Sequence, residues 1–198
     1  MRQLFATLLA GAVLIVPFVS RAQSTTDYPN RPIRLVVGFA PGGATDTLAR
    51  LLTGALGQEL GQTIYVENIA GASGYIAWRN VASSAPDGYT LLLAENAIAI
   101  RPGFKDMTPT FDPATELDAV ASVAHSPLAL CVADALPVSS VKELIAYSHS
   151  GKTLNYASAG TGSVAQLVWE VVKDGAKIDA LSVPYRGGGP AMAAIVAG

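Results

Sequence analysis

The sequence predicts an α/β protein built mainly from parallel strands. Short apolar, strand-like runs alternate with helix-like segments along the chain, and turns rich in small residues join strands to the helices that follow them. A strand–helix–strand succession favours parallel pairing, because the crossover helix returns the chain to the same end of the sheet. A chain of 198 residues is long enough for one good core or two small ones.

The first part of the chain predicts three strands and two helices. The strand Ile33–Phe39 is apolar, and the helix Asp46–Leu56 has apolar residues at helical spacing. Thr45 or Asp46 is expected to cap this helix. The elements that follow are expected to be a strand, a helix, a turn and a strand, at Thr63–Glu67, Ser73–Ser84, Pro86–Gly88 and Thr90–Ala94.

The middle of the chain departs from this pattern. Residues 101–117 carry prolines and charges, which predicts a loop-rich excursion. Ala119–Ala124 and Leu128–Ala133 are apolar and strand-like, and Pro127 between them indicates a chain that crosses between two lobes. Cys131, the only cysteine, lies in the second run, so we expect a buried thiol and no intrachain disulfide.

A second strand–helix unit repeats the opening arrangement. Ser139 or Ser140 is expected to cap a helix that ends near Ser148, because Ser140 and Glu143 have the spacing of a capping box. The elements that follow are expected to be a strand, a helix, a strand and a final helix, at Leu154–Ala157, Val164–Val172, Ala180–Val183 and Ala191–Ala197.

Two loops of small residues predict a binding site. Each follows a strand and precedes a helix, at the edge where open α/β sheets bind ligands. Free backbone N–H groups and a helix N-terminus favour an anion there, and two such loops can hold the two ends of a dianion, or a head group and a tail. Neither loop contains Arg or Lys, so the anion is expected to be bound mainly by N–H groups and water. The first loop comprises Ala40, Pro41, Gly42, Gly43, Ala44, Thr45 and Asp46, and the second comprises Ser158, Ala159, Gly160, Thr161, Gly162 and Ser163.

The first 22 residues predict a cleaved export signal. Arg2 precedes the apolar run Leu4–Val19, and the small residues before and at Ala22 suit cleavage after that residue. The run is about 16 residues long, short of the roughly 20 that span a membrane. A membrane anchor is the alternative interpretation of this run. No later apolar run is long enough to span a membrane, and a net charge of −2 argues against a nucleic-acid partner.

Catalytic and metal sites are not indicated by the sequence. Ser163 lies in no Gly-x-Ser-x-Gly elbow, so a hydrolase that uses it is only a weak alternative. His125 and His149 have no partner at metal-ligand spacing, and Gly187–Gly189 lacks the Lys-Ser/Thr of a phosphate-binding loop. We therefore expect no cofactor, no metal and no enzymatic activity. Arg186 is expected to lie on the surface or between lobes.

Several blocks occur together in a fixed order along the chain: Tyr28–Val37, Pro41–Asp46, Val66–Asn68, Gly71–Gly74, Ala85–Leu91, Pro137–Leu144, Ser158–Ser163 and Val183–Gly187. In this order they resemble the tripartite tricarboxylate transporter receptors, also called the Bug family, over essentially all of residues 27–198. Tyr75 and Trp78 depart from the family, because they are bulkier than the residues common there, and are expected to reshape the packing of their helix.

The resemblance implies a receptor of the bacterial periplasm with a two-lobed, periplasmic-binding-protein-like fold. Residues 1–22 would be the signal peptide, 23–124 the first lobe and 125–198 an incomplete second lobe, because family members continue further. The lobes would close on a small carboxylated solute and present it to membrane transporter subunits. The two loops would bind the solute, and Asn96 and Tyr185 would line the cleft. The alternative is an exported fragment of such a receptor that binds nothing.

Overall fold

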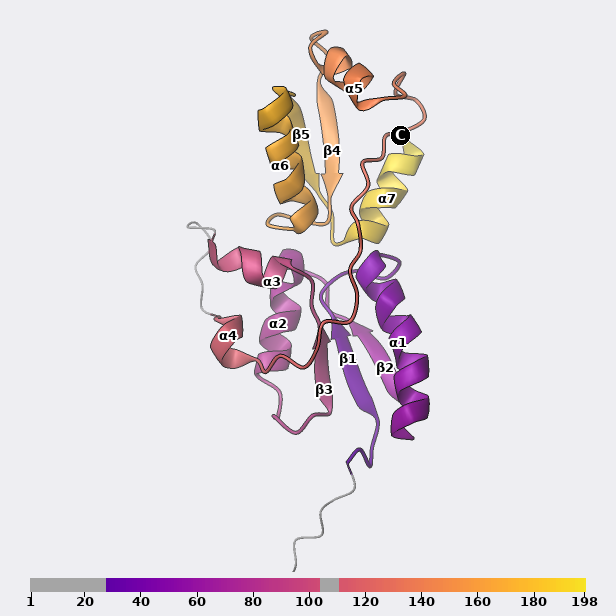
Figure 1. Ribbon diagram of the computed structural model, residues 1–198, viewed down its shortest axis with the longest axis vertical. Coiled ribbons are helices and arrows are strands. Elements are labelled where there is room, and N and C mark those ends of the chain that lie inside the picture. Colours follow the sequence, from indigo (N-terminus) through magenta and orange to yellow (C-terminus); the bar gives the residue numbers. More distant parts are fainter. Residues whose placement is uncertain (1–27, 104–110) are drawn as a thin grey trace, which may run out of the picture.

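The computed structural model describes residues 28–103 and 111–198; the predicted signal peptide and its cleavage site lie outside the described residues. The described chain forms two α/β lobes, which Figure 1 shows one above the other. The first lobe contains a three-stranded sheet and the second a two-stranded sheet. The strand pairs in both sheets are parallel, which confirms the predicted fold class.

The first lobe is a sheet covered by a helix on each face (Figure 1). Strand β1 (Ile33–Val37) lies at the centre, between β2 (Ile64–Asn68) and β3 (Thr90–Leu93). Helix α1 (Ala44–Leu60) packs on one face and α2 (Tyr75–Ala82) on the other. Shorter elements complete the lobe: a 3₁₀ turn at Ala72–Gly74, α3 (Ala97–Ile100), a 3₁₀ turn at Arg101–Gly103, and α4 (Pro113–Glu116).

Alternation along β1 divides the core of this lobe in two. Ile33, Leu35 and Val37 pack with α1, whereas Val36 packs with Trp78 of α2. Successive side chains of a strand point to opposite faces, so a central strand buried on both sides is apolar at nearly every position. This burial explains why the first strand is recognisable in the sequence.

The second lobe has the same construction on a smaller scale. Its sheet contains β4 (Leu154–Ser158) and β5 (Ala180–Pro184), with Leu154 paired to Ala180. A separate core joins Leu144 and Tyr156 to Trp169 and their neighbours. The Ser140 side chain accepts a hydrogen bond from the Glu143 amide, which confirms Ser140 as the cap. The helices of this lobe are α5 (Val141–Ser148), α6 (Val164–Ala176) and α7 (Gly188–Ala197).

Residues 118–132, which connect the lobes, are exposed and form no strand. The strands predicted at Ala119–Ala124 and Leu128–Ala133 are therefore wrong. A strand needs a partner for its backbone groups, and no strand in the described ranges pairs with this segment. No helix or strand crosses the lobe boundary predicted between 124 and 125, which stays a prediction.

Cys131 lies in this segment and is exposed, so the expected buried thiol is also wrong. We expect the thiol of the native protein to react with an aromatic disulfide reagent about as fast as that of the urea-unfolded protein, because no packing shields it. Stopped-flow absorbance measures both rates. A native rate that is slower by orders of magnitude would contradict the exposed position.

Two helices begin earlier than predicted. Helix α1 begins at Ala44, and α7 begins at Gly188 rather than Ala191. Pro190 lies in the first turn of α7, where its missing N–H would have no helical partner in any case. Helices α3 and α4 were not predicted, because elements this short show no helical periodicity. None of the helices in the described ranges is long and apolar enough to cross a membrane.

Candidate functional site

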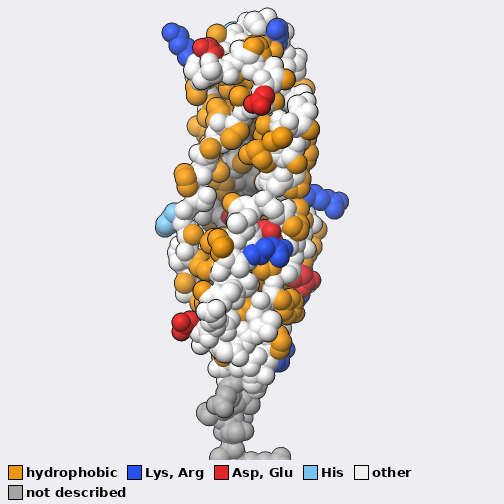
Figure 2. All heavy atoms as spheres, turned by 90° about the vertical axis from the view of Figure 1, so that its right-hand side faces the viewer, with side chains coloured by type: hydrophobic (Ala, Val, Ile, Leu, Met, Phe, Trp, Pro, Cys, Tyr) orange, Lys and Arg blue, Asp and Glu red, His pale blue; other side chains and the backbone are white. Residues whose placement is uncertain are grey.

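A cavity of about 340 Å³ lies between the lobes. Figure 2 shows the surface hollowed at mid-height, between the upper and the lower lobe. Residues that follow strands of both lobes line the cavity, which therefore lies at the carboxyl ends of the two sheets, where α/β proteins bind ligands. Its volume is within the roughly 300–1,000 Å³ of small-molecule pockets.

Some of the residues predicted for the site line this cavity and others do not. Tyr185 and three residues of the second loop do so, namely Ala159, Gly160 and Thr161. Ala40 lies at its edge, where its amide donates a hydrogen bond to the Arg186 carbonyl (2.8 Å). The lining does not include Ser158, Ser163, Asn96 or the remaining first-loop residues Pro41, Gly42, Gly43, Ala44, Thr45 and Asp46. The assignment of all these residues to ligand binding stays a prediction. Cavity residues that the sequence did not indicate are Gly38, Phe39, Gly71, Ala72, Ser73, Arg101, Pro184 and Arg186.

Asp46 holds the first loop in shape. Asp46 is 3% exposed, and its carboxylate accepts hydrogen bonds from the Gly42 amide and the Asn68 side chain, both at 2.9 Å. It also forms an ion pair with Arg50, one turn further along α1 (2.9 Å). The side-chain hydrogen bond from Arg50 is the main cause that lowers the pKa of Asp46 to about 2. Asp46 is therefore ionised, with its oxygens occupied by donors of the protein itself.

The expected cap of α1 by Thr45 or Asp46 is wrong. The helix begins after Gly43, which makes no side-chain capping bond, and Asp46 is the third helical residue. From there its carboxylate reaches back to the Gly42 amide, one residue before the cap position Gly43. The small side chains before the helix allow this return contact.

We expect Asp46→Asn to lower the free energy of unfolding by about 2 kcal/mol at pH 7. A folded-state pKa of about 2, below the ordinary 3.8, means that the charge stabilises the fold above about pH 4. That stabilisation is lost as the pH falls towards 2, so the difference from the wild-type protein should shrink. Urea unfolding at pH 7 and pH 3 measures this difference, with Asp87→Asn in the exposed pair with Arg31 as a control that costs at most about 1 kcal/mol. An Asp46→Asn loss that does not change with pH would contradict the ionised network.

Two helix N-termini without side-chain caps meet where the lobes touch. Gly43 before α1 and Gly187 before α7 make no capping bond. The first turns of the two helices lie close together, because a Cβ built on Gly43 would be 3.3 Å from the amide nitrogen of Gly189 in the first turn of α7. The positive ends of two helix dipoles therefore face each other across the lobes. The sequence signal for the second helix start was the Gly-Gly-Pro of its first turn.

In the second predicted loop, backbone N–H groups bond to nearby side chains, which the sequence did not indicate. Ser163 is the cap of α6, and its side chain accepts a hydrogen bond from the Gln166 amide (3.3 Å). The Gln166 side chain in turn accepts from the Gly162 amide (2.7 Å). The N-terminus of α6 is thus partly satisfied by its own residues, and this reduces the number of N–H groups open to a ligand.

Ser73 links the lobes from a strained turn. Its hydroxyl donates a hydrogen bond to the Thr161 carbonyl of the second lobe (2.5 Å). Ala72 and Ser73 both have left-handed backbone angles, with φ of 46° and 54°, which are unfavourable for residues other than glycine. Strain of this kind concentrates at functional sites, where surrounding contacts hold it in place.

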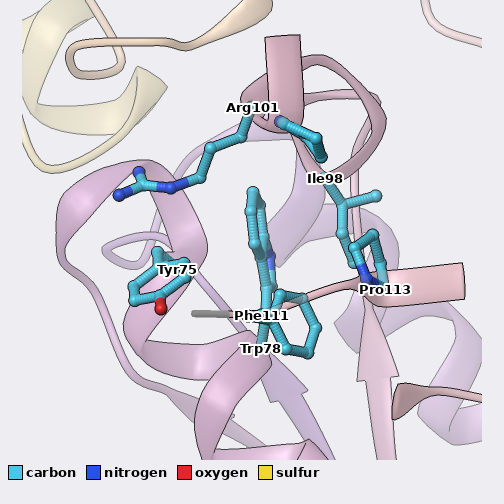
Figure 3. Close-up of a pocket in the computed structure, with 7 residues that line it drawn as sticks. Tyr75, Trp78, Ile98, Arg101, Phe111 and Pro113 are labelled. Carbon is cyan, nitrogen blue, oxygen red and sulfur yellow. The ribbon is translucent and has the colours of Figure 1, made fainter. Parts of the chain in front are cut away.

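Arg101 lines the cavity from the first lobe, and Figure 3 shows its side chain extending over the Tyr75 ring. Its guanidinium lies 4.3 Å from the centre of the Tyr75 ring and donates a hydrogen bond to the Ala72 carbonyl (3.0 Å). Trp78, which is 1% exposed, and Phe111 both pack edge-on against the Tyr75 ring and support it. The small pocket drawn in Figure 3 has a volume of about 10 Å³, which is room for one water at most. It is therefore too small to be a ligand site, and Tyr75, which lines it, supports Arg101.

Ser163 does not have the surroundings of a nucleophile. It is 1% exposed and is used as the helix cap. His149 contacts the Lys177 carbonyl, beyond the opposite end of α6, about 20 Å of helix away. Within residues 28–103 and 111–198, no group of three or more His, Cys, Asp or Glu is placed to hold a metal.

Comparison with known proteins gives a family and several relatives. The model of the tripartite tricarboxylate transporter family receptor matches residues 48–198. A UPF0065 protein of Bordetella bronchiseptica is 36% identical over 193 residues, covering 97% of this chain and 57% of that protein. The chain thus spans a little over half the length of this relative.

Two solved structures have the same architecture. A protein of R. palustris, solved with adipate, is 36% identical, with a TM-score of 0.82 over 85% of this chain and 57% of that one. MatC of Rhodopseudomonas palustris, solved with bound malate, is 34% identical, with a TM-score of 0.68 over the same shares. Sequence, fold and family model agree, and the chain belongs to the family of tripartite tricarboxylate transporter receptors.

Proposed function

We propose that this protein is an exported receptor that binds a small carboxylated solute between its lobes and presents it to membrane transporter subunits. The observation that carries the proposal is the cavity of about 340 Å³ at the carboxyl ends of both sheets. Binding there needs no covalent chemistry. Closure of the lobes on the solute would give the transporter a form that differs from the empty receptor.

Relatives support a carboxylate as the ligand, since neighbours of the same fold were solved with adipate and with malate. The N-terminus of α7 follows directly on the cavity residues Tyr185 and Arg186 and favours the same chemistry, whereas the ionised Asp46 offsets the positive end of the α1 dipole. We propose that the first loop acts through its backbone, held by Asp46, and that Ala159–Thr161 and Tyr185 contact the solute directly. Export to the periplasm, with cleavage after Ala22, belongs to the same proposal.

Thermal unfolding with a panel of mono-, di- and tricarboxylates tests the proposal. A solute at about 100 times its dissociation constant stabilises the folded state by roughly 2.7 kcal/mol. For a chain of this size, that raises the melting temperature by about 5–10 °C. A cooperative transition that rises with one class of carboxylate is the expected result.

Two other outcomes would favour the alternatives. A transition that no carboxylate shifts would favour the fragment without a binding role. Turnover of simple esters that is lost in Ser163→Ala would favour the hydrolase, although the buried position of Ser163 argues against it. Each outcome is distinct from the expected shift, so one set of samples separates the three functions.

A further inference from the structure

The arginines of the described ranges fall into two groups. Four lie in the first lobe and are paired with carboxylates: Arg31 with Asp87, Arg34 with Glu67, Arg50 with Asp46 and Arg79 with Glu116. The other two, Arg101 and Arg186, form no ion pair with any residue the structure describes. Both of these line the cavity between the lobes.

Arg101 is preorganised to take a carboxylate. A guanidinium has five N–H donors in a planar fork, and among the residues that the structure describes Arg101 donates to one acceptor, the Ala72 carbonyl. The Tyr75 ring fixes the plane of the fork at 4.3 Å, so little side-chain freedom remains to be lost on binding. Arg101 thus offers the planar, charge-assisted contact that suits a carboxylate.

Arg186 brings a second positive charge from the opposite lobe. Its backbone is fixed by the hydrogen bond from the Ala40 amide, while its side chain is exposed. Arg101 and Arg186 thus bring two like charges to the lining of one cavity, where they repel each other and where each would lose hydration if the lobes closed. A ligand with a negative group at each end would compensate both, whereas a ligand with one would leave an uncompensated charge.

We propose that Arg101 and Arg186 determine specificity by each taking one carboxylate of a dicarboxylate, so that the receptor discriminates against monocarboxylates of the same length. This inference rests on the proposed function and narrows it to a ligand class. It also changes the expectation that N–H groups and water are the main contacts of the anion, because the charges come from outside both predicted loops. Tyr75, which touches Arg101 from the side, is a positioning residue.

Calorimetric titration tests the assignment with matched probes. Succinate, glutarate and adipate are compared with butyrate, valerate and hexanoate, which have the same chains and one carboxylate. We expect the wild-type protein to prefer the best dicarboxylate by tenfold or more. Arg101→Gln and Arg186→Gln should each lower the affinity for that dicarboxylate by roughly 10- to 100-fold and change the affinity for the monocarboxylate much less. Each variant should therefore lose the preference for the dicarboxylate.

Control variants test whether the loss of affinity comes from the contacts of Arg101 and Arg186 with the carboxylates or from the mere removal of a positive charge. Arg31→Gln removes the same charge from an exposed pair and should leave both affinities unchanged. Arg101→Lys keeps the charge without the fork and should recover part of the affinity, and Tyr75→Phe should retain binding that Tyr75→Leu weakens.

Equal affinity of the wild-type protein for mono- and dicarboxylates, or arginine variants that bind dicarboxylate normally, would overturn the inference and leave the receptor function intact. A wild-type protein that binds none of the six acids, and whose melting temperature no mono-, di- or tricarboxylate shifts, would overturn both.

Discussion

Gly189→Ala is expected to weaken solute binding by roughly tenfold or more while leaving the melting temperature nearly unchanged. A Cβ at this position would lie 2.7 Å from the Pro41 carbonyl oxygen and 3.0 Å from the Gly42 carbonyl carbon. Both atoms belong to the backbone of the other lobe, so no side chain can rotate away and the lobes must move apart. The helix itself should tolerate the change, because alanine favours helical structure more than glycine does.

Gly188→Ala is the matched control for this prediction. Gly188 precedes Gly189 in the first turn of α7, and a Cβ there would meet no atom within 4 Å. The two variants have the same composition and the same helix, and they differ only in contact with the first lobe. Calorimetric titration of both should show a loss of affinity for Gly189→Ala alone. An equal loss in both would mean that the contact between the lobes does not set the shape of the site.

Trp78→Ala is expected to lower the free energy of unfolding by about 3–5 kcal/mol, a large part of the total stability of a domain. The side chain is 1% exposed and belongs to the core cluster of Val36, Ala77 and Phe111. Truncation loses the buried apolar area and leaves a cavity that the neighbours fill only in part. Urea unfolding followed by far-ultraviolet circular dichroism measures the loss.

Two further variants give stability losses with which the Trp78→Ala loss can be compared. Trp78→Phe keeps an aromatic ring against Tyr75 and Phe111 and should cost clearly less than Trp78→Ala. Tyr65→Ala removes an aromatic ring that is 47% exposed on β2 and should also cost much less. A Trp78→Ala protein as stable as the wild-type protein would contradict the close packing of the first lobe.

The strands and most helices were predictable because their signals are local. The apolar run of β1 and the capping box at Ser140 depend on neighbours in the chain, and both appear where the sequence indicates. The carboxyl-end rule for parallel sheets directed attention to the loops after β1 and β4, and Ala159–Thr161 of the second loop line the cavity. Local signals failed at residues 118–132, because apolar composition does not reveal whether a strand partner is present.

The missed cavity residues depend on contacts between distant parts of the chain. Arg101 follows a four-residue helix, and nothing near it in the sequence shows that its guanidinium stacks on Tyr75. Ser73 meets Thr161 across 88 positions of sequence, and Gly189 meets Pro41 only once the two lobes are in place. The bulky Tyr75 and Trp78, recognisable in the sequence as unusual, turn out to hold an arginine at the cavity.

The most direct test of the central claim is amide hydrogen exchange of the protein with and without a saturating dicarboxylate. Binding between the lobes predicts slower exchange in loops of both lobes at once, at residues 38–43 and 71–73 on one side and 159–162 and 185–189 on the other. The far ends of the strands should serve as an unchanged internal reference. Protection confined to one lobe, or no change in either, would contradict a solute site between them.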